Sequence, residues 1–183
     1  MSASCGILAL DGGPPERDKL EAMLGAMARH GPDGSGRWHD ACAGLGQQMM
    51  HVTPESLAEK QPVHDGASRV TLVLDGRLDN RDDLLRALGV TQSTQLPDSS
   101  LVLRAYRKWG QDCVYHLVGE FAFAVWDARE RTLFCVTDPM GIQPLFYREV
   151  PGQYFAFASE VEALLALTGG RSALNHTRLA MLG

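Results

Sequence analysis

The sequence lacks the features that mark membrane-spanning and secreted proteins. No apolar run is long enough to cross a bilayer, and the opening stretch MSASCGILALDGG has no basic segment of the kind that begins a secretory signal. The four cysteines, at positions 5, 42, 113 and 135, are scattered, and no two form a C-x-x-C pair. We therefore expect a soluble cytoplasmic protein with reduced thiols and no membrane partner.

Charge and histidine spacing exclude two further kinds of partner. The formal net charge is -5, and the absence of a basic stripe argues against binding to nucleic acid. The six histidines lack the spacing of metal ligands, and the glycine-rich segment 30–36 has no G-K-[ST] ending. We expect no metal site, no nucleotide phosphate loop and no cofactor in this domain.

The strongest pattern that is present runs from Gly119 to Tyr147. Two apolar runs, 121–126 and 133–136, flank a polar five, and both runs are rich in aromatic and β-branched residues. The pattern predicts a β-hairpin. Neither run alternates with polar residues, so both faces of both strands should be covered. At 183 residues, the chain is long enough to supply these covering layers within one domain.

Strands and helices are predicted on both sides of this hairpin. Strands are expected at 4–11, 36–39, 43–50, 70–75, 144–148 and 154–158, and helices at 16–29, 80–88, 98–109 and 159–167. Asn80 and Asp98 suit helix N-caps, and Ser159 with Glu162 suits a capping box. The sum is a layered α+β domain with helices on both faces of antiparallel sheets.

Several short motifs together resemble one family. They are Cys5-Gly6-Ile7, HGPDGSG at 30–36, DGRLDN at 75–80, Asp98, GEFAFA at 119–124 and DPMGIQPLFY at 138–147. In order and approximate spacing they are similar to the class II glutamine amidotransferase domain of the asparagine synthetase family. The resemblance implies the N-terminal-nucleophile hydrolase fold, a four-layer αββα sandwich of antiparallel sheets.

The resemblance also implies a partner. In that family the amidotransferase domain is followed by a synthetase domain that uses ATP and magnesium, and no phosphate loop of the SGGxDS type occurs here. We assign residues 1–168 to the amidotransferase-like domain, and residues 169–183 to a linker or the start of a missing synthetase domain. The synthetase partner is expected in cis or in trans.

Cys5 aligns with the family's nucleophile. A working member has this cysteine as its first residue, and its free α-amino group serves as the base. Here four residues precede Cys5, and removal of the initiator methionine would leave Ser2 first. Activity would need a further cleavage before Cys5. The alternative, a small buried thiol at the start of a strand, is favoured.

The residues that would hold glutamine are largely replaced. Gly76 retains the family's oxyanion-hole glycine, but Asp75 stands where the resemblance implies a donating asparagine, and losing one such donor typically costs about 100- to 1,000-fold in rate. Arg77 replaces a glutamate, and Met49 or its neighbour falls where an arginine would bind the substrate carboxylate. Asp98 matches the aspartate that binds the substrate amine, and it could also cap a helix.

These substitutions favour a degenerate, inactive glutaminase site. We expect a domain with a structural or docking role in an ATP-dependent amide-forming enzyme, similar to β-lactam synthetases or lasso-peptide cyclases. Two alternatives stay open. One is an active glutaminase that uses Cys5 after N-terminal processing, takes glutamine and supplies ammonia for asparagine synthesis. The other is a non-enzymatic binding module.

Overall fold

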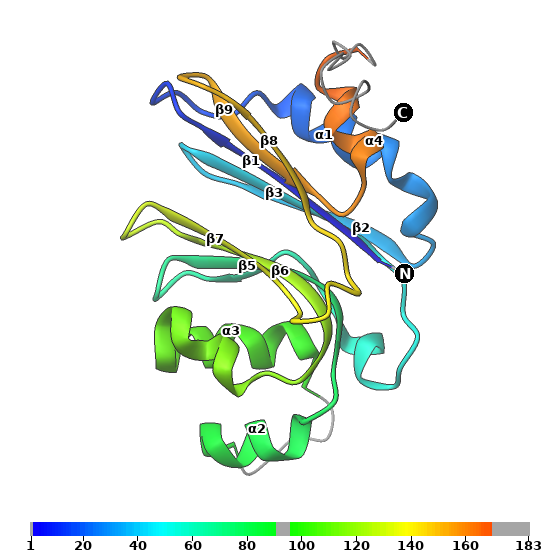
Figure 1. Ribbon diagram of the computed structural model, residues 1–183, viewed down its shortest axis with the longest axis vertical. Coiled ribbons are helices and arrows are strands. Elements are labelled where there is room, and N and C mark those ends of the chain that lie inside the picture. The colour runs from blue at the N-terminus through cyan, green and yellow to red at the C-terminus, as the bar shows by residue number, and fades with distance from the viewer. Residues whose placement is uncertain (1, 91–95, 170–183) are drawn as a thin grey trace, which may run out of the picture.

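Two antiparallel β-sheets lie face to face in the computed structural model, which describes residues 2–90 and 96–169 (Figure 1). Within these residues, one sheet has the strand order β2-β3-β1-β9-β8 and the other has the order β4-β5-β6-β7. The first sheet comprises β1 (Ala3–Ala9), β2 (Gly34–His39), β3 (Ala43–Met49), β8 (Phe146–Val150) and β9 (Tyr154–Ala158). The second comprises β4 (Val63–Asp65), β5 (Val70–Leu78), β6 (Gly119–Asp127) and β7 (Thr132–Thr137).

Helices cover the outer face of each sheet. α1 (Arg17–Ala26) and α4 (Val161–Ala166) pack on the five-stranded sheet, and α2 (Arg81–Leu88) and α3 (Asp98–Trp109) lie beyond the four-stranded sheet (Figure 1). Three 3-10 helices, η1 (Ala28–His30), η2 (Glu55–Ala58) and η3 (Gly110–His116), complete the described elements. The predicted four-layer αββα architecture is confirmed.

Each pair of neighbouring layers encloses its own apolar core. Leu20, Met23 and Leu24 of α1 are buried against the five-stranded sheet. Leu45 and Trp126 belong to the core between the two sheets, and the third core joins α3 to the four-stranded sheet. Strands of both sheets therefore bury two faces, which explains their continuous apolar runs.

The expected hairpin is formed by β6 and β7, but its two strands differ in burial. Residues 121–126 of β6 are buried, as predicted. β7 is only partly buried because it is the edge strand of its sheet. The prediction that both strands are covered on both faces is therefore wrong for β7.

The three predicted side-chain caps are absent. Asn80 instead accepts from Val118 N and donates to His116 O, both at 3.0 Å. Asp98 is the first residue of α3 and its side chain makes no cap hydrogen bond. Ser159 Oγ accepts from Ser4 N at 2.9 Å, so the capping box with Glu162 does not form. These polar side chains bind backbone groups of other elements rather than their own helices.

What the structure shows of the end of the chain, of membrane spans and of metal sites holds only for the residues that it describes. The predicted linker or domain start at 169–183 lies outside the described residues except for Gly169. Among the described residues, no helix is long and apolar enough to cross a membrane. The same residues contain no group of three or more His, Cys, Asp or Glu side chains that could hold a metal ion.

Candidate functional site

A cleft of about 340 Å³ is lined by Ser2, the residue just before β1 begins. Five residues singled out from the sequence line it: Met49, Asp75, Gly76, Arg77 and Asp98. They come from β3, β5 and the start of α3, which are far apart along the chain. The fold thus collects most of the predicted site residues in one place.

The open edge of β5 forms one wall of the cleft. β4 pairs with β5 only as far as Leu72. The side chain of Gln61 then replaces the missing strand, since its Oε1 accepts from Leu74 N at 2.6 Å and its Nε2 donates to Leu74 O at 2.9 Å. Backbone groups of alternate residues point to the same edge of a strand, so the N–H of Gly76 faces the cleft.

Only glycine fits at position 76. Its φ is +127°, and a Cβ atom there would lie 2.1 Å from the carbonyl oxygen of Glu120 on β6. The backbone of β5 therefore approaches β6 more closely than a side chain permits. This close approach holds a backbone donor at the wall of the cleft.

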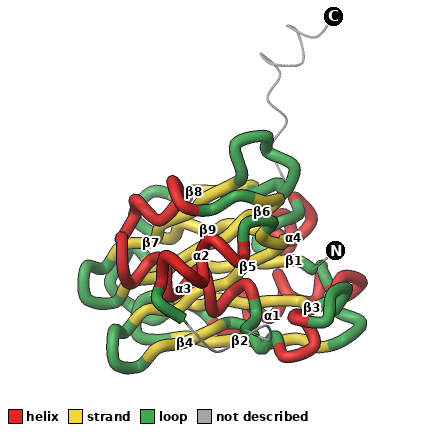
Figure 2. The backbone as a smooth tube through the Cα atoms, turned by 90° about the horizontal axis from the view of Figure 1, so that it is seen from below, coloured by secondary structure: helices red, strands yellow, loops and turns green. Residues whose placement is uncertain are grey.

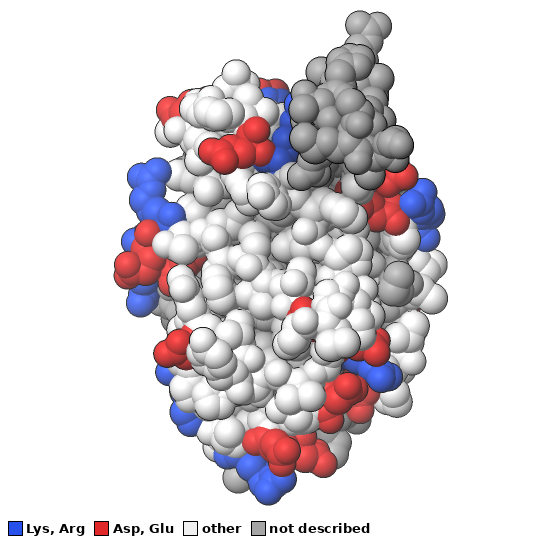
Figure 3. Space-filling view, viewed as in Figure 1, with Lys and Arg blue, Asp and Glu red and all other residues white. Residues whose placement is uncertain are grey.

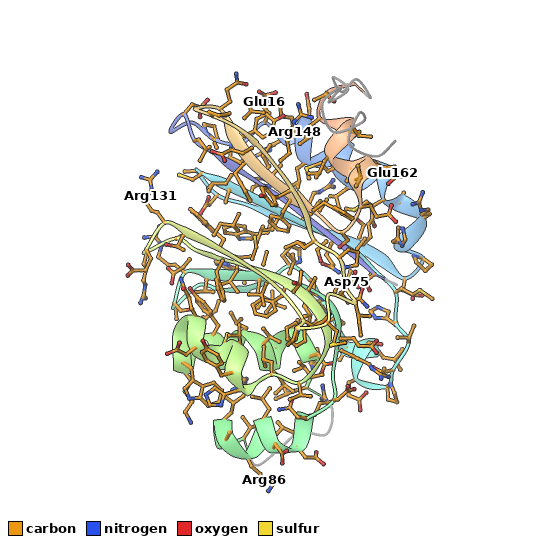
Figure 4. The ribbon with its side chains drawn as sticks, in the orientation of Figure 1. Glu16, Asp75, Arg86, Arg131, Arg148 and Glu162 are labelled. Atoms are coloured by element: carbon orange, nitrogen blue, oxygen red, sulfur yellow. The ribbon has the colours of Figure 1, made fainter. Side chains whose placement is uncertain are left out.

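Asp75 lies between the two sheets, whereas the labelled Arg86, Arg131 and Arg148 lie at the periphery (Figure 4). The Asp75 side chain is buried, and burial raises its pKa to about 6, against the opposing effects of His30 and of a hydrogen bond with Ser159. At neutral pH the group is mostly ionised and accepts hydrogen bonds rather than donating them. It therefore adds negative charge to the cleft beside Gly76.

Both carboxylate oxygens of Asp98 already have partners. Oδ2 accepts from Leu78 N at 2.9 Å, and Oδ1 pairs with the Arg81 guanidinium. Arg81 also donates to Leu96 O at 2.6 Å. Asp98 thus ties α3 to the end of β5 and to the start of α2, and its charge is neutralised by the chain itself.

Carboxylates outnumber cations around the cleft. Arg77 is the one arginine or lysine among the described lining residues, and it pairs with Asp79, with 3.4 Å between Nε and Oδ1. Met49 and Met50 line the side where the resemblance implies an arginine. The lining carboxylates belong to Glu55, Glu59, Asp75, Asp98 and Glu120. The cleft therefore disfavours a ligand that carries a free carboxylate.

Cys5 does not line the cleft. On β1, the neighbouring Ser4 faces the other sheet, since its Oγ donates to Gln47 Oε1 at 2.8 Å and Gln47 Nε2 donates to Leu74 O at 3.1 Å. Successive side chains of a strand alternate between faces, so Cys5 points the other way, toward α1. It is fully buried in the core that contains Leu24.

The environment of Cys5 disfavours a thiolate. Burial raises the pKa of its thiol well above the usual range, and the nearby charge of Glu21 raises it further. A thiol must lose its proton to become a strong nucleophile. In this position Cys5 contributes to packing.

Several lining residues were not predicted from the sequence, among them Ser2, Glu59, Gln61 and Gln143. Ser2 is on the same face of the first strand as Ser4, and the polar-apolar alternation from Ser2 to Cys5 could have indicated which face meets the cleft. Burial raises the pKa of Glu59, and the Ser99 hydroxyl, which donates to Glu59 Oε1, opposes that shift. No sequence signal pointed to Gln61 or Gln143.

Comparison with known proteins gives the same family as the motifs. Residues 4–182 match the family described as "Glutamine amidotransferase domain". Asparagine synthetase [glutamine-hydrolyzing] 3 of Bacillus subtilis is 33% identical over 171 residues, which cover 90% of this chain and 27% of that protein. A putative asparagine synthetase [glutamine-hydrolyzing] of Mycobacterium tuberculosis is 35% identical over 184 residues, covering 89% of this chain and 28% of that protein.

A solved structure shares the fold at lower sequence identity. Glutamine phosphoribosylpyrophosphate amidotransferase of B. subtilis, complexed with ADP and GMP, aligns with a TM-score of 0.70 and 16% identity over 91% of this chain and 43% of that one. The chain spans about a quarter of the length of the two synthetase relatives. With these matches and the four-layer fold, the chain belongs to the glutamine amidotransferase domain family and has asparagine synthetases among its relatives.

Proposed function

We propose that this domain does not hydrolyse glutamine and instead has a structural, docking role in an ATP-dependent amide-forming enzyme of the asparagine synthetase family. One observation carries the proposal. The thiol of Cys5, which aligns with the family's nucleophile, faces α1 and not the cleft. A nucleophile must reach the substrate carbonyl, and nucleophilic attack from a thiol buried in an apolar core is disfavoured.

The arrangement of polar groups in the cleft supports the same proposal. Glutamine carries an α-amine, an α-carboxylate and a side-chain amide, and each needs a partner. Asp98, which would bind the amine, is already bound by Arg81 and Leu78. Met49 offers no cation to the carboxylate, and Asp75 presents an acceptor where the developing oxyanion needs a donor.

The proposed partner is a synthetase domain, joined to this chain or supplied as a separate polypeptide. ATP and magnesium would bind in that domain. The length of the synthetase relatives supports this division, because about three quarters of each relative lies outside the matched region. We propose that the whole enzyme is similar to a lasso-peptide cyclase or a β-lactam synthetase. A cytoplasmic location stays a prediction from the sequence.

Glutamate release from L-glutamine tests the proposal. The purified chain, alone and with its synthetase partner, should produce no glutamate above the rate of a protein-free blank. The Cys5→Ala and Ser2→Ala variants should match the wild-type chain, with circular dichroism as the control for folding. Turnover that either variant abolishes would contradict the proposal, and the variant that abolished it would identify the nucleophile.

The first alternative is an active glutaminase that begins at Cys5 and supplies ammonia for asparagine synthesis. The relatives' names include glutamine hydrolysis, which makes this the natural competitor. Cleavage before Cys5 would remove Ala3 and Ser4, which pair with Gln48 and Gln47 of β3. Intact mass of the purified chain separates the two readings: a species that begins at Cys5 supports the alternative, and a chain that retains Ser2 supports our proposal.

The second alternative is a binding module with no enzymatic partner. It shares with our proposal the absence of glutamine turnover, so the glutaminase assay does not separate them. Co-purification with a synthetase polypeptide separates the two proposed functions. Stable association with such a polypeptide supports the proposal, whereas association only with a non-enzymatic protein would support the alternative.

A further inference from the structure

We propose that the face formed by β7, β8 and the loop between them is the surface that binds the synthetase domain. We define this edge face by Met140, Ile142, Pro144, Phe146 and Tyr147. The inference rests on the docking part of the proposed function and goes further by placing the contact. None of these five residues lines the cleft described above, so the two sites can be tested separately.

Large apolar side chains are exposed on the edge face. Met140 is 82% exposed, Tyr147 is 72% exposed, and Ile142 and Phe146 are exposed as well. All four lie within eight consecutive residues. Figure 3 shows that the centre of this side of the molecule is nearly free of charged groups, and that lysine, arginine, aspartate and glutamate side chains lie around its rim. An apolar centre with a charged rim is typical of a protein interface.

The loop that carries Met140 and Ile142 is held in a defined shape. The carboxylate of Asp138 accepts from the backbone N–H groups of Met140 at 2.9 Å, Ile142 at 3.2 Å and Gln143 at 3.1 Å. Gly141 adopts a φ of +64°, and its N–H bonds to the carbonyl oxygen of Asp138 at 2.9 Å. The exposed side chains are therefore presented by a preorganised turn, which lowers the entropic cost of binding.

Two sheet edges lie on this side of the sandwich. β7 is an edge strand of the four-stranded sheet and β8 is an edge strand of the five-stranded sheet, and Figure 2 shows them on the same side of the molecule, opposite β4 and β2. β7 reads TLFCVT and carries no charged residue. Natural edge strands that stay exposed usually carry charges or prolines. The edge of β8 carries Arg148 and Glu149, whereas the uncharged edge of β7 indicates a surface that a partner covers.

A groove between the two edges offers a place for a partner's apolar side chain. Its volume is about 290 Å³, and its walls include Val136 of β7, Tyr147 of β8 and Phe157 of β9. Tyr147 stacks on Phe155 with their ring centroids 5.7 Å apart, which fixes one wall. A concave apolar groove ringed by aromatic side chains is where interface hot spots tend to form.

The occupant that fits best is the synthetase domain rather than a second copy of this chain. The synthetase relatives continue for about three quarters of their length outside the matched region, so a large domain must find a surface on this one. The same loop also reaches the cleft, because Gln143 lines it while Ile142 is exposed on the edge face. A domain bound there would lie next to the cleft.

Titration calorimetry with a purified partner tests the inference. The probe is the asparagine-synthetase-type polypeptide of the same organism, expressed without its own amidotransferase domain where it has one. We expect Ile142→Asp and Tyr147→Ser each to raise Kd by at least about tenfold, as loss of an interface hot spot does. The matched control is Tyr115→Ser. Tyr115 is 83% exposed on η3, which packs with α3 outside the four-stranded sheet. It should leave Kd unchanged within about twofold.

The outcomes separate the inference from the proposed function. If the wild-type chain binds the probe and the edge-face variants bind equally well, the edge face is not the binding surface, while the proposed docking role stands. If the wild-type chain does not bind the probe, the docking role fails, and the inference fails with it. Self-association of the chain that Ile142→Asp abolishes, measured by analytical ultracentrifugation without the probe, would overturn the inference in favour of a second copy. Melting temperatures of all variants confirm that they fold.

Discussion

Arg81 and Asp98 form a partly buried ion pair across the start of α2 and the start of α3. The side chains are 18% and 15% exposed. The second oxygen of Asp98 accepts from Leu78 N, at the end of β5. A residue that the family resemblance assigns to substrate binding therefore joins three elements of this chain. The same contacts give Asp98 a structural role that does not depend on a substrate.

Replacing Asp98 should destabilise the fold. In Asp98→Ala the guanidinium of Arg81 and the N–H of Leu78 lose their acceptor while still shielded from water, which should cost about 2–3 kcal/mol of unfolding free energy. The measurement is urea unfolding followed by circular dichroism. The control is Asp83→Ala, because Asp83 pairs with Arg86 where both side chains are at least 70% exposed, and the change should stay within about 0.5 kcal/mol. Equal losses in the two variants would show that the Asp98 contacts are not structural.

Asp75 should make the protein less stable as the pH rises. Burial raises its pKa from 3.8 to about 6 in the folded chain. Between these two values the folded state binds more protons than the unfolded state, so the contribution of Asp75 to stability falls as the pH rises through this window. Above about pH 7 the folded state carries the full cost of a buried ionised carboxylate.

The variant Asp75→Asn tests this dependence because its amide does not ionise. At pH 7.5 it should be more stable than the wild-type chain by roughly 1–3 kcal/mol, and the difference should shrink toward zero near pH 4. Urea unfolding at several pH values measures both. Taking the difference between the two proteins removes the contributions of other titrating groups, such as Glu59. A difference that does not change with pH would mean that Asp75 titrates normally.

The fold was predictable from the sequence, because apolar runs indicate the buried strands and the order of the motifs indicates the family. The run at 121–126 is continuous, which predicts a strand buried on two faces, and the structure pairs it, as β6, with the strand predicted at 70–75, which lies in β5. The helix caps were not predictable in the same way. Asn80 and Ser159 bind backbone groups 38 and 155 residues away in sequence, and no local pattern records such contacts.

The composition of the cleft was only partly predictable. Motif positions on β5 led to Asp75 and Gly76, and the structure brings them together with Met49 and Asp98. The orientation of Cys5 was harder to predict, because β1 is buried on both faces and only the short alternation from Ser2 to Cys5 indicates which face meets the cleft. Gln61 joins the site by replacing a strand that ends early, a contact that depends on the tertiary fold.

Adding a methyl group at Gly76 should lower the free energy of unfolding more than adding one at a glycine whose Cβ position has no atom within 4 Å. In Gly76→Ala the Cβ would lie 2.1 Å from the carbonyl oxygen of Glu120, and the backbone would keep an unfavourable φ of +127°. We expect a loss of at least about 3 kcal/mol. In Gly152→Ala the φ is +71° with nothing within 4 Å, so the loss should be about 1 kcal/mol. Chemical unfolding of both variants measures the contrast, and similar losses would argue against close approach of β5 and β6.

The four cysteines should differ sharply in reactivity. Cys42 is partly exposed, and its Sγ lies 3.7 Å from Arg131 Nη2, so the reagent can reach the sulfur without opening a core. Cys5 is fully buried and burial raises the pKa of its thiol, while burial raises the pKa of Cys113 to about 11. With iodoacetamide at pH 8, Cys42 should be alkylated first, and Cys5 should react at least about tenfold more slowly.

Peptide mapping by mass spectrometry at timed intervals measures these rates. Alkylation in denaturant is the control for chemical competence, and all four thiols should then react at similar rates. The Cys42→Ser variant confirms which site gives the fast phase. A Cys5 that is alkylated as fast as Cys42 in the folded protein would place an accessible thiolate at this position, and the case for an inactive glutaminase site would lose its main support.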